Sequence, residues 1–296
     1  TIFTTMPELP EVETIVRGLD SILPKKTIKS ISFDTSKSFP NDQKEVELFA
    51  INSKIVNVRR RAKVIIIDLS TSYSFIIHLK MTGQLVYKST KKTFGGGHPN
   101  DSLIGNLPDK STRVTVELKD GSWLFFNDQR KFGWVKLLPT IEIMNLNFFK
   151  KIGPEPLNIK FNSVEFYNRL QRRLKSSIKP VLLDQTIIAG IGNIYADESL
   201  WLAKIHPVTR VQKLSKRKID VLLESIRKVL NLSLDKGGST DKNYINAFGE
   251  KGSYLEFANV FRRAGQPCPR CGTPIIKMKV NGRGTHICPK EQKIVI

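Results

Sequence analysis

The chain has 296 residues, and its 48 Lys and Arg against 27 Asp and Glu give a formal net charge of +21. This excess favours a polyanionic partner, nucleic acid first, although a basic protein without such a partner would share the composition. No apolar run approaches the roughly 20 residues of a membrane span, and the N-terminus lacks the apolar stretch of a signal peptide. Three cysteines are too few for a disulfide framework. We therefore expect a two-domain cytoplasmic protein with no membrane partner.

The segment Met6-Pro-Glu-Leu-Pro-Glu-Val-Glu-Thr14 allows two interpretations. Removal of an initiator Met6 would leave Pro7 as a free secondary amine beside the Glu8 carboxylate, and such an amine can attack an aldehyde-like carbon to form an iminium. This chemistry requires that Thr1 to Thr5 are upstream read-through, absent from the active protein. The alternative is that Pro10 and the acidic residues only begin a helix over residues 10–23, whose apolar positions share one face.

The rest of the chain changes character near residue 140. Residues 27–138 have mostly strand patterns, with a hairpin signal at Asp120-Gly121, and Gly95-Gly96-Gly97 predicts a mobile loop. Helical periodicity dominates afterwards and is clearest over residues 214–234. Strands followed by helices predict an α+β chain with segregated domains.

All three cysteines lie near the C-terminus. Cys268 and Cys271 form a C-x-x-C pair, and Cys288 follows after sixteen intervening residues, which is typical of a zinc site. Glu291 stands at the fourth position, where an oxygen is a harder ligand than a thiolate, and His286 is another candidate. A loop that folds without metal is the alternative.

Several shorter patterns are compatible with DNA binding and with ordinary structure. Gly190 to Tyr195 is either a phosphate-binding helix start with Asn193 as a donor, or a tight turn between helices. Arg59 to Lys63 is either a row of cations along a nucleic-acid backbone, with one lysine in proton transfer, or a solvated strand edge. Met81, Arg130 and Phe132 follow strand ends, and are either core and surface residues or a wedge that replaces an extruded base.

Together these segments resemble the formamidopyrimidine-DNA glycosylases, bacterial base-excision enzymes for oxidised purines. The matching motifs occur in family order between Met6 and about Gln292: Pro7 to Thr14, Arg60 to Lys63, Ile152 to Pro156, Gly190 to Tyr195, and the cysteine cluster. The resemblance implies an α+β protein with an N-terminal β-sandwich and N-terminal helix, then a helix–two-turn–helix domain and a zinc finger. The implied parts are residues 1–6 (upstream and initiator), 7–139 (catalytic β-sandwich), 140–156 (linker), 157–258 (helix–two-turn–helix) and 259–296 (zinc-finger hairpin).

The resemblance also implies residue roles in a DNA glycosylase and AP lyase. Pro7 would attack C1′ of a flipped-out nucleotide while Glu8 protonates the opening sugar, and Lys63 would assist β-elimination. Arg283 would bind phosphate and assist δ-elimination.

The remaining implied roles concern DNA and metal. The DNA-contacting residues would be the phosphate ligands His78 and Asn193, the wedge Met81, Arg130 and Phe132, with Arg130 facing the orphaned cytosine, and Lys242 in the lesion-capture loop at 238–253. One structural Zn2+ would be held by Cys268, Cys271, Cys288 and Glu291. The expected partner is double-stranded DNA with oxidised bases, bound by a monomer in the basic cleft between the domains, in a bacterial cytoplasm at the nucleoid.

Two departures and two alternatives accompany this resemblance. Glu291 replaces a cysteine of the family pattern, and Ser111-Thr112-Arg113 replaces a segment that usually contains histidine. An endonuclease VIII-like enzyme for oxidised pyrimidines would usually begin Pro-Glu-Gly-Pro, and Leu9 argues against it. A non-catalytic damaged-DNA-binding protein would have no need of Pro7 with Glu8.

Overall fold

The computed structural model describes residues 6–98, 101–103, 105–239 and 253–295. The chain divides into two compact units, Thr1–Lys150 with Lys236–Ser253, and Lys151–Asp235 with Tyr254–Ile296. The predicted read-through segment, Thr1 to Thr5, lies outside the described residues. Each unit is described by itself.

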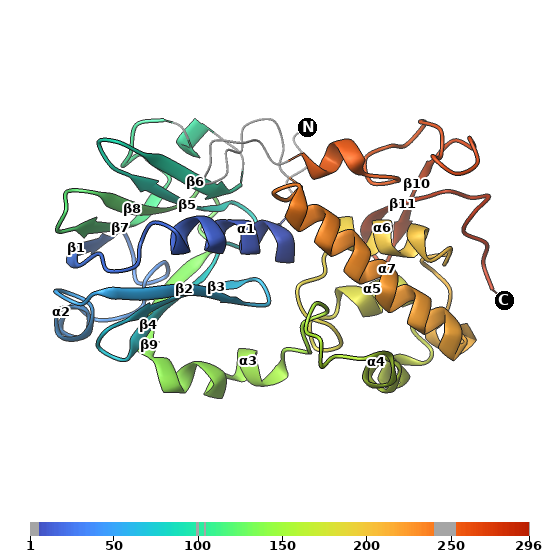
Figure 1. Ribbon diagram of the computed structural model, residues 1–296, viewed down its shortest axis with the longest axis horizontal. Coiled ribbons are helices and arrows are strands. Elements are labelled where there is room, and N and C mark those ends of the chain that lie inside the picture. Colours follow the sequence, from blue (N-terminus) through green and yellow to red (C-terminus); the bar gives the residue numbers. More distant parts are fainter. Residues whose placement is uncertain (1–5, 99–100, 104, 240–252, 296) are drawn as a thin grey trace. The chain divides into compact units, whose positions relative to one another are not determined.

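The first unit is a sandwich of two antiparallel sheets (Figure 1). One sheet has the strand order β1 (Ile28–Phe33), β7 (Thr112–Leu118), β8 (Trp123–Asp128), β5 (Gly83–Lys88), β6 (Thr93–Gly97). The other has the order β2 (Ile55–Arg61), β3 (Val64–Leu69), β4 (Tyr73–His78), β9 (Trp134–Pro139). The unit also contains the helices α1 (Leu9–Asp20) and α2 (Gln43–Phe49), and the short turns η1 (Asp101–Leu103) and η2 (Thr140–Asn145), with α3 (Asn147–Lys151) at its end.

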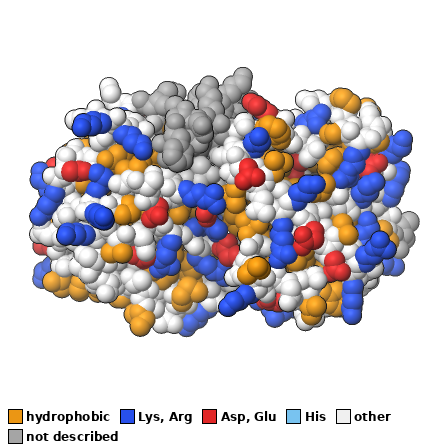
Figure 2. All heavy atoms as spheres, viewed as in Figure 1, with side chains coloured by type: hydrophobic (Ala, Val, Ile, Leu, Met, Phe, Trp, Pro, Cys, Tyr) orange, Lys and Arg blue, Asp and Glu red, His pale blue; other side chains and the backbone are white. Residues whose placement is uncertain are grey.

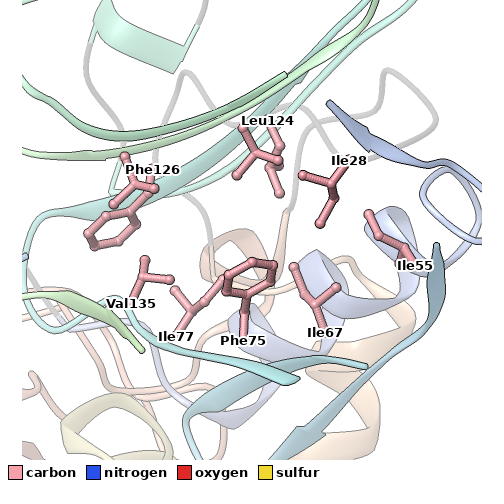
Figure 3. Close-up of a pocket in the computed structure, with 10 residues that line it drawn as sticks. Ile28, Ile55, Ile67, Phe75, Ile77, Leu124, Phe126 and Val135 are labelled. Carbon is pink, nitrogen blue, oxygen red and sulfur yellow. The ribbon is translucent and has the colours of Figure 1, made fainter. Parts of the chain in front are cut away.

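The core of this unit forms where the two sheets face each other. Ile28, Leu124 and Phe126 of one sheet point toward Phe75 and Ile77 of the other (Figure 3), and these side chains are buried. Strand alternation places such residues on one face, so the alternating pattern over 114–118 is explained by this core.

Helix α1 covers an edge of the sandwich. It packs against β2 and β6, the edge strands of the two sheets, through the buried face that contains Val12, Ile15 and Leu19 (Figure 1). The predicted helix over 10–23 is confirmed, although the structure ends it at Asp20. This packing places the start of α1, and with it Pro7 and Glu8, at a defined position on the sandwich.

The predicted mobile loop at Gly95 to Gly97 is wrong, because these residues form β6 and pair with β5. Close packing explains the glycines. A Cβ on Gly95 would lie 3.1 Å from Leu103 Cδ2, and Gly97 has φ +123° with the Gly83 carbonyl oxygen 2.3 Å from an added Cβ. These glycines therefore occur because there is no room for side chains beside this strand, and not because the segment is a loop.

The second unit is helical with one hairpin. Its elements are α4 (Ser163–Leu170), η3 (Gln171–Arg173), α5 (Ile178–Leu183), α6 (Asn193–Leu202), η4 (Val211–Lys213), α7 (Lys216–Asp235), η5 (Tyr254–Phe257), and the antiparallel pair β10 (Ile276–Val280) and β11 (Arg283–Ile287). The predicted helix over 214–234 is confirmed by α7, whose buried face packs on α6 and α4. No helix among the described residues is both long and apolar enough to cross a membrane.

Candidate active site

The start of α1 is held by a carboxylate of its own first turn. Glu8 is 2% exposed, and its backbone N–H donates to Glu11 Oε2 at 2.9 Å. The other oxygen of Glu11 accepts the backbone N–H of Ser239 at 2.7 Å. Glu11 therefore joins the Pro7-Glu8 segment to the first residues of the predicted lesion-capture loop.

Lys63 and His78 come together beside the β2–β3 hairpin. Lys63 occupies the turn after Ala62 (φ 53°) and is 6% exposed, and Val64 pairs with His78 across β3 and β4. Burial, with the nearby Lys80 and Lys63 charges, lowers the pKa of His78 to about 3. Its ring Nδ1 accepts the backbone N–H of Lys80 at 3.0 Å, so the neutral ring has its proton on Nε2.

The three predicted wedge residues lie on two neighbouring turns. Met81 is in the turn between β4 and β5, while Arg130 and Phe132 are in the turn between β8 and β9. Phe132 is 49% exposed, and the Arg130 guanidinium lies 4.8 Å from the centre of its ring. The structure thus brings together a flexible apolar side chain, a cation and an exposed aromatic ring.

Asp128 joins these two turns. It is completely buried, and its carboxylate accepts the Thr82 hydroxyl of the first turn. From the second turn it accepts the backbone N–H groups of Arg130 (3.1 Å), Phe132 (2.8 Å) and Gly133 (2.6 Å). A single carboxylate therefore bonds the backbone of Arg130 and Phe132 and the side chain of Thr82, the residue that follows Met81.

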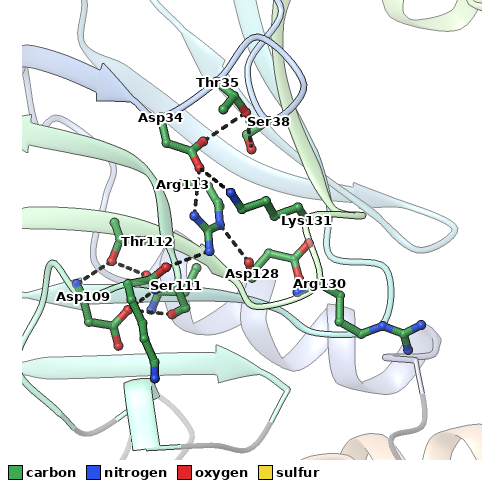
Figure 4. A network of polar contacts seen from close by, with 12 residues as sticks. Asp34, Thr35, Ser38, Asp109, Ser111, Thr112, Arg113, Asp128, Arg130 and Lys131 are labelled. Carbon is green, nitrogen blue, oxygen red and sulfur yellow. Dashed lines mark hydrogen bonds and ion pairs between the residues drawn. The ribbon is translucent and has the colours of Figure 1, made fainter.

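Arg113 lies beside Asp128 and bonds the backbone of the same region (Figure 4). The Arg113 guanidinium donates to the Asp128 carbonyl (2.8 Å), the Lys110 carbonyl (2.8 Å) and Asp34 Oδ2 (2.8 Å). Burial acts to raise the pKa of the Asp34 carboxyl, but hydrogen bonds from Arg113 and Ser38 outweigh it and lower that pKa. Arg113 lies in the segment where the family usually has a histidine, and here it is a buried cation with a structural role.

In the second unit, Asn193 and Arg283 lie close together. Asn193 is the first residue of α6, and its Nδ2 donates to the Gly284 carbonyl at 3.0 Å. Arg283 is exposed and follows the hairpin turn at Asn281 and Gly282, both of which have positive φ. The start of α6 is thereby bonded to the residue next to Arg283.

A buried ion pair holds this hairpin on α6. Lys179 Nζ lies 2.6 Å from Asp197 Oδ1, and also donates to the Gly284 carbonyl (3.1 Å) and Thr285 Oγ1 (2.8 Å). Asp197 Oδ2 accepts the backbone N–H of His286 at 2.9 Å and lies 3.4 Å from its ring Nδ1. The His286 ring is thus beside Asp197, while the metal-ligand atoms that gather nearby are sulfurs.

The three cysteines converge as a metal site requires. The Sγ atoms of Cys268, Cys271 and Cys288 lie within 4.8 Å of one another, and within the described residues no fourth His, Cys, Asp or Glu joins this group. Three convergent thiols suit zinc, which takes tetrahedral sulfur ligation. Glu291, the predicted fourth ligand, has its Oε2 2.9 Å from Lys204 Nζ.

Sequence reasoning missed the buried charges under both groups of residues, namely Asp128, Arg113, Lys179 and Asp197. A signal existed for Asp128, since an Asp at a strand end often accepts N–H groups of the following turn. The predicted residue Lys242 lies outside the described part of the chain. On the surface, Lys and Arg side chains are spread widely, with fewer acidic ones between them (Figure 2).

Comparison with known proteins assigns these features to one class, a base-excision DNA glycosylase with a zinc finger. The formamidopyrimidine-DNA glycosylase N-terminal domain matches residues 6–135, the H2TH domain of the same enzymes matches residues 152–244, and a zinc finger found in FPG and IleRS matches residues 265–290. The predicted fold is confirmed: a β-sandwich with an N-terminal helix, an H2TH domain and a zinc finger.

Similar proteins extend the match to nearly the whole chain. The formamidopyrimidine-DNA glycosylases of Ligilactobacillus salivarius and Pelotomaculum thermopropionicum are 41% and 40% identical to it, each over 98% of this chain and 99% and 100% of their own. A Lactococcus lactis FPG mutant in complex with Fapy-dG containing DNA superimposes with a TM-score of 0.85 at 34% identity, covering 97% of this chain and all of that one. The chain belongs to the formamidopyrimidine-DNA glycosylase family, and it is a base-excision repair enzyme with glycosylase and AP lyase activity.

Proposed function

We propose that this enzyme removes oxidised purines from duplex DNA through a covalent intermediate at Pro7. The Pro7 nitrogen attacks C1′ of the flipped-out nucleotide, the C1′–N bond to the base breaks, and the base leaves with a proton. Glu8 protonates the ring oxygen as the sugar opens, which leaves an iminium between Pro7 and C1′. The observation that carries this proposal is the Pro7-Glu8 pair at the start of α1, where Glu8 is buried and Glu11 bonds its backbone.

The iminium acidifies the C2′ proton, and loss of that proton breaks the C3′–O bond in β-elimination. We assign this step to Lys63, which is buried beside His78 in the first unit. Neutral His78 holds its proton on Nε2, so it serves as a hydrogen-bond donor to phosphate. Hydrolysis of the iminium frees Pro7 at the end of the cycle.

The flipped-out nucleotide leaves a gap in the duplex that the three wedge residues would fill. Met81 and Phe132 supply apolar surface for the gap, and the Arg130 guanidinium has donors that match the acceptors of the orphaned cytosine. The arrangement of two turns around Asp128 supports this role. Opposite-base selection would therefore depend on the exact geometry of these turns.

Two residues of the second unit would contact phosphate. Asn193 Nδ2 uses one hydrogen on the Gly284 carbonyl, which leaves its second available. Arg283 projects next to it, and we assign it phosphate binding and δ-elimination, in which the C5′–O bond breaks. Lys242 completes the proposed contacts as a residue of the lesion-capture loop.

One structural Zn2+ would hold the hairpin that contains Arg283. Cys268, Cys271 and Cys288 would be its thiolate ligands, with Glu291 as the predicted fourth. The metal supplies folding free energy, because the short hairpin has little apolar core of its own. Glu198 also stabilises the segment before the zinc finger, because it accepts the backbone N–H groups of Val260 and Phe261, both at 2.8 Å.

The partner and setting follow from the same assignments. Similar Lactococcus lactis proteins form complexes with abasic-site DNA and with Fapy-dG containing DNA. We propose that this chain acts as a cytoplasmic monomer on double-stranded DNA at the nucleoid. We also propose the domain boundaries 7–139, 157–258 and 259–296, with a linker over 140–156.

An activity on oxidised pyrimidines is the second candidate. One observation favours it, since the wild-type Lactococcus lactis protein also forms a complex with an oxidised pyrimidine containing DNA. The two activities are distinguished by the rates at which the enzyme cleaves two duplexes of otherwise identical sequence. One contains 8-oxoguanine and the other an oxidised pyrimidine, each opposite its normal pairing base. A preference for the pyrimidine lesion would contradict the proposed substrate.

Borohydride trapping tests the mechanism directly. A chain beginning at Pro7 should form a covalent adduct with a duplex containing 8-oxoguanine opposite cytosine, because borohydride reduces the iminium to a stable amine. A chain with one residue before Pro7 should bind this duplex and give no adduct. Trapping by a chain with a verified blocked N-terminus would show that Pro7 is not the nucleophile.

The variant Arg283→Ala tests whether Arg283 acts in strand scission and not in removal of the base. We expect weaker binding, and strand scission slowed more than glycosidic cleavage. Gel analysis of the same time course gives both rates, since released base and cut strand are measured separately. Unchanged scission would remove Arg283 from the mechanism.

A further inference from the structure

The predicted zinc site has Glu291 where a site of four thiolates would have its fourth cysteine. In the structure, the Glu291 side chain contacts residues other than the three cysteines. Its backbone N–H lies 3.5 Å from Cys288 Sγ, so the residue is at the right place in the chain for a fourth ligand. Its carboxylate, however, lies 2.9 Å from Lys204 Nζ and 3.8 Å from Arg270 Nη1. The carboxylate therefore interacts with two cations, while the three sulfurs form a group without it.

The backbone of Lys204 and the side chain of Arg270 are both placed by contacts that do not involve Glu291. Lys204 follows α6 with a left-handed backbone (φ 55°), and its N–H donates to the Trp201 carbonyl at 3.1 Å. The Arg270 guanidinium lies 3.8 Å from the centre of the Trp201 ring and donates to the Trp201 (2.8 Å) and Leu202 (3.0 Å) carbonyls. Lys204 and Arg270, both bonded to the end of α6, thus place two positive charges next to position 291.

We propose that Lys204 and Arg270 compete with zinc for the Glu291 carboxylate, which leaves the fourth coordination position exchangeable. Zinc bound by three thiolates gains less from a hard carboxylate than from a fourth thiolate. A structural zinc site is normally closed by four protein ligands, and an open position takes a small exogenous donor. Here that donor would be water or a low-molecular-weight thiol.

Zinc release to a colorimetric chelator measures this competition. Lys204→Met should slow release by about two- to fivefold, the range expected from an exposed ion pair, because Glu291 can then remain on the metal. The matched variant Lys228→Met removes a charge from α7, where Lys228 has no ion-pair partner among the described residues, and should leave the rate unchanged. In a Glu291→Gln background, Lys204→Met should have no effect.

The same experiment can overturn the proposal. An equal slowing by Lys204→Met with and without Glu291→Gln would show a general charge effect, and no slowing at all would show that Lys204 does not compete. Glu291→Cys should slow release on the order of tenfold or more, because a thiolate closes the site and is not attracted to the lysine in the same way. The Co2+-substituted Glu291→Cys protein should also show a stronger thiolate charge-transfer absorption than wild type, and an identical spectrum would contradict an open fourth position.

These measurements follow the metal and not the DNA reaction. A failure of the Pro7 mechanism in borohydride trapping would leave the zinc result unaffected, and the reverse also holds.

Discussion

The two units hold their proposed DNA-contacting turns with different chemistry. In the first unit, the Asp128 carboxylate is buried, and its donors among the described residues are all neutral: one hydroxyl and three backbone N–H groups. In the second, Asp197 is equally buried but pairs with Lys179, whose ammonium also bonds the hairpin. The negative charge of Asp128 is thus stabilised by the neutral donors of two turns, whereas the negative charge of Asp197 is neutralised by Lys179. We call these two buried carboxylates the hubs of their units.

This difference fits what each turn must do. A carboxylate surrounded by backbone N–H groups fixes the path of a turn, because the donors belong to residues of the same turn. An ion pair between α5 and α6 instead fixes the distance between elements, and the hairpin is attached to it through Gly284 and Thr285. The first arrangement determines the shape of a wedge, while the second determines where a separate hairpin lies.

Removing one member of the ion pair should give the largest effect. Lys179→Met leaves Asp197 as an uncompensated buried charge, which should lower the free energy of unfolding by about 3–5 kcal/mol. Urea unfolding of the second unit, followed by Trp201 fluorescence, measures the change. Adding Asp197→Asn should recover a large part of the loss, and an absence of recovery would mean that the cost is one of packing.

Asp128→Asn should cost less, about 2–3 kcal/mol, because the amide keeps one acceptor and no opposite charge is left unpaired. The physical loss is one of charge-assisted hydrogen bonds to the second turn. The variant should also discriminate less between cytosine and other bases opposite the lesion, measured as the ratio of excision rates. Asp184→Asn is a matched control, since Asp184 accepts the backbone N–H and the hydroxyl of Thr186 in a turn of the second unit. An equal loss of discrimination there would refute a special role for Asp128.

The sequence predicted the wedge residues and the cysteine cluster more readily than the hubs beneath them. Cys268 and its partners are recognised from local spacing, whereas Met81 and Arg130 are assigned to a wedge through the resemblance to the family. Lys179 takes its role from a residue 106 positions away, and Asp128 bonds the other turn through Thr82, 46 positions away. No local pattern reports these long-range contacts, although the bonds from Asp128 to its own following turn have a local signal. The same holds for Gly95 to Gly97, whose composition predicted a loop because the tight packing that requires glycine is a tertiary property.

Burial of His78 makes the stability of the first unit depend on pH. The pKa of His78 is about 3 in the folded protein, against about 6.5 when unfolded, so the unfolded chain binds more protons between these values. The stabilisation is present above pH 6.5 and is lost as the pH falls toward 3. Between pH 7 and 5 the loss should be about 2 kcal/mol, by linkage. His78→Gln should remove this part of the pH dependence in urea unfolding, and an unchanged slope would show that the pKa of His78 does not differ between the folded and unfolded states.

The smallest expected effect concerns Arg113, which supports the Asp128 hub through the backbone. Arg113→Met keeps the aliphatic stem but removes donors to the Asp128 and Lys110 carbonyls and the partner of Asp34. Because Asp34 is partly exposed, water can replace that partner, and we expect a loss of about 1 kcal/mol. Combining Arg113→Met with Asp128→Asn tests whether the two act together. If the double variant loses less unfolding free energy than the two single variants added together, the two residues form one coupled network. Strict additivity would mean that Arg113 stabilises the sandwich without helping to position the wedge.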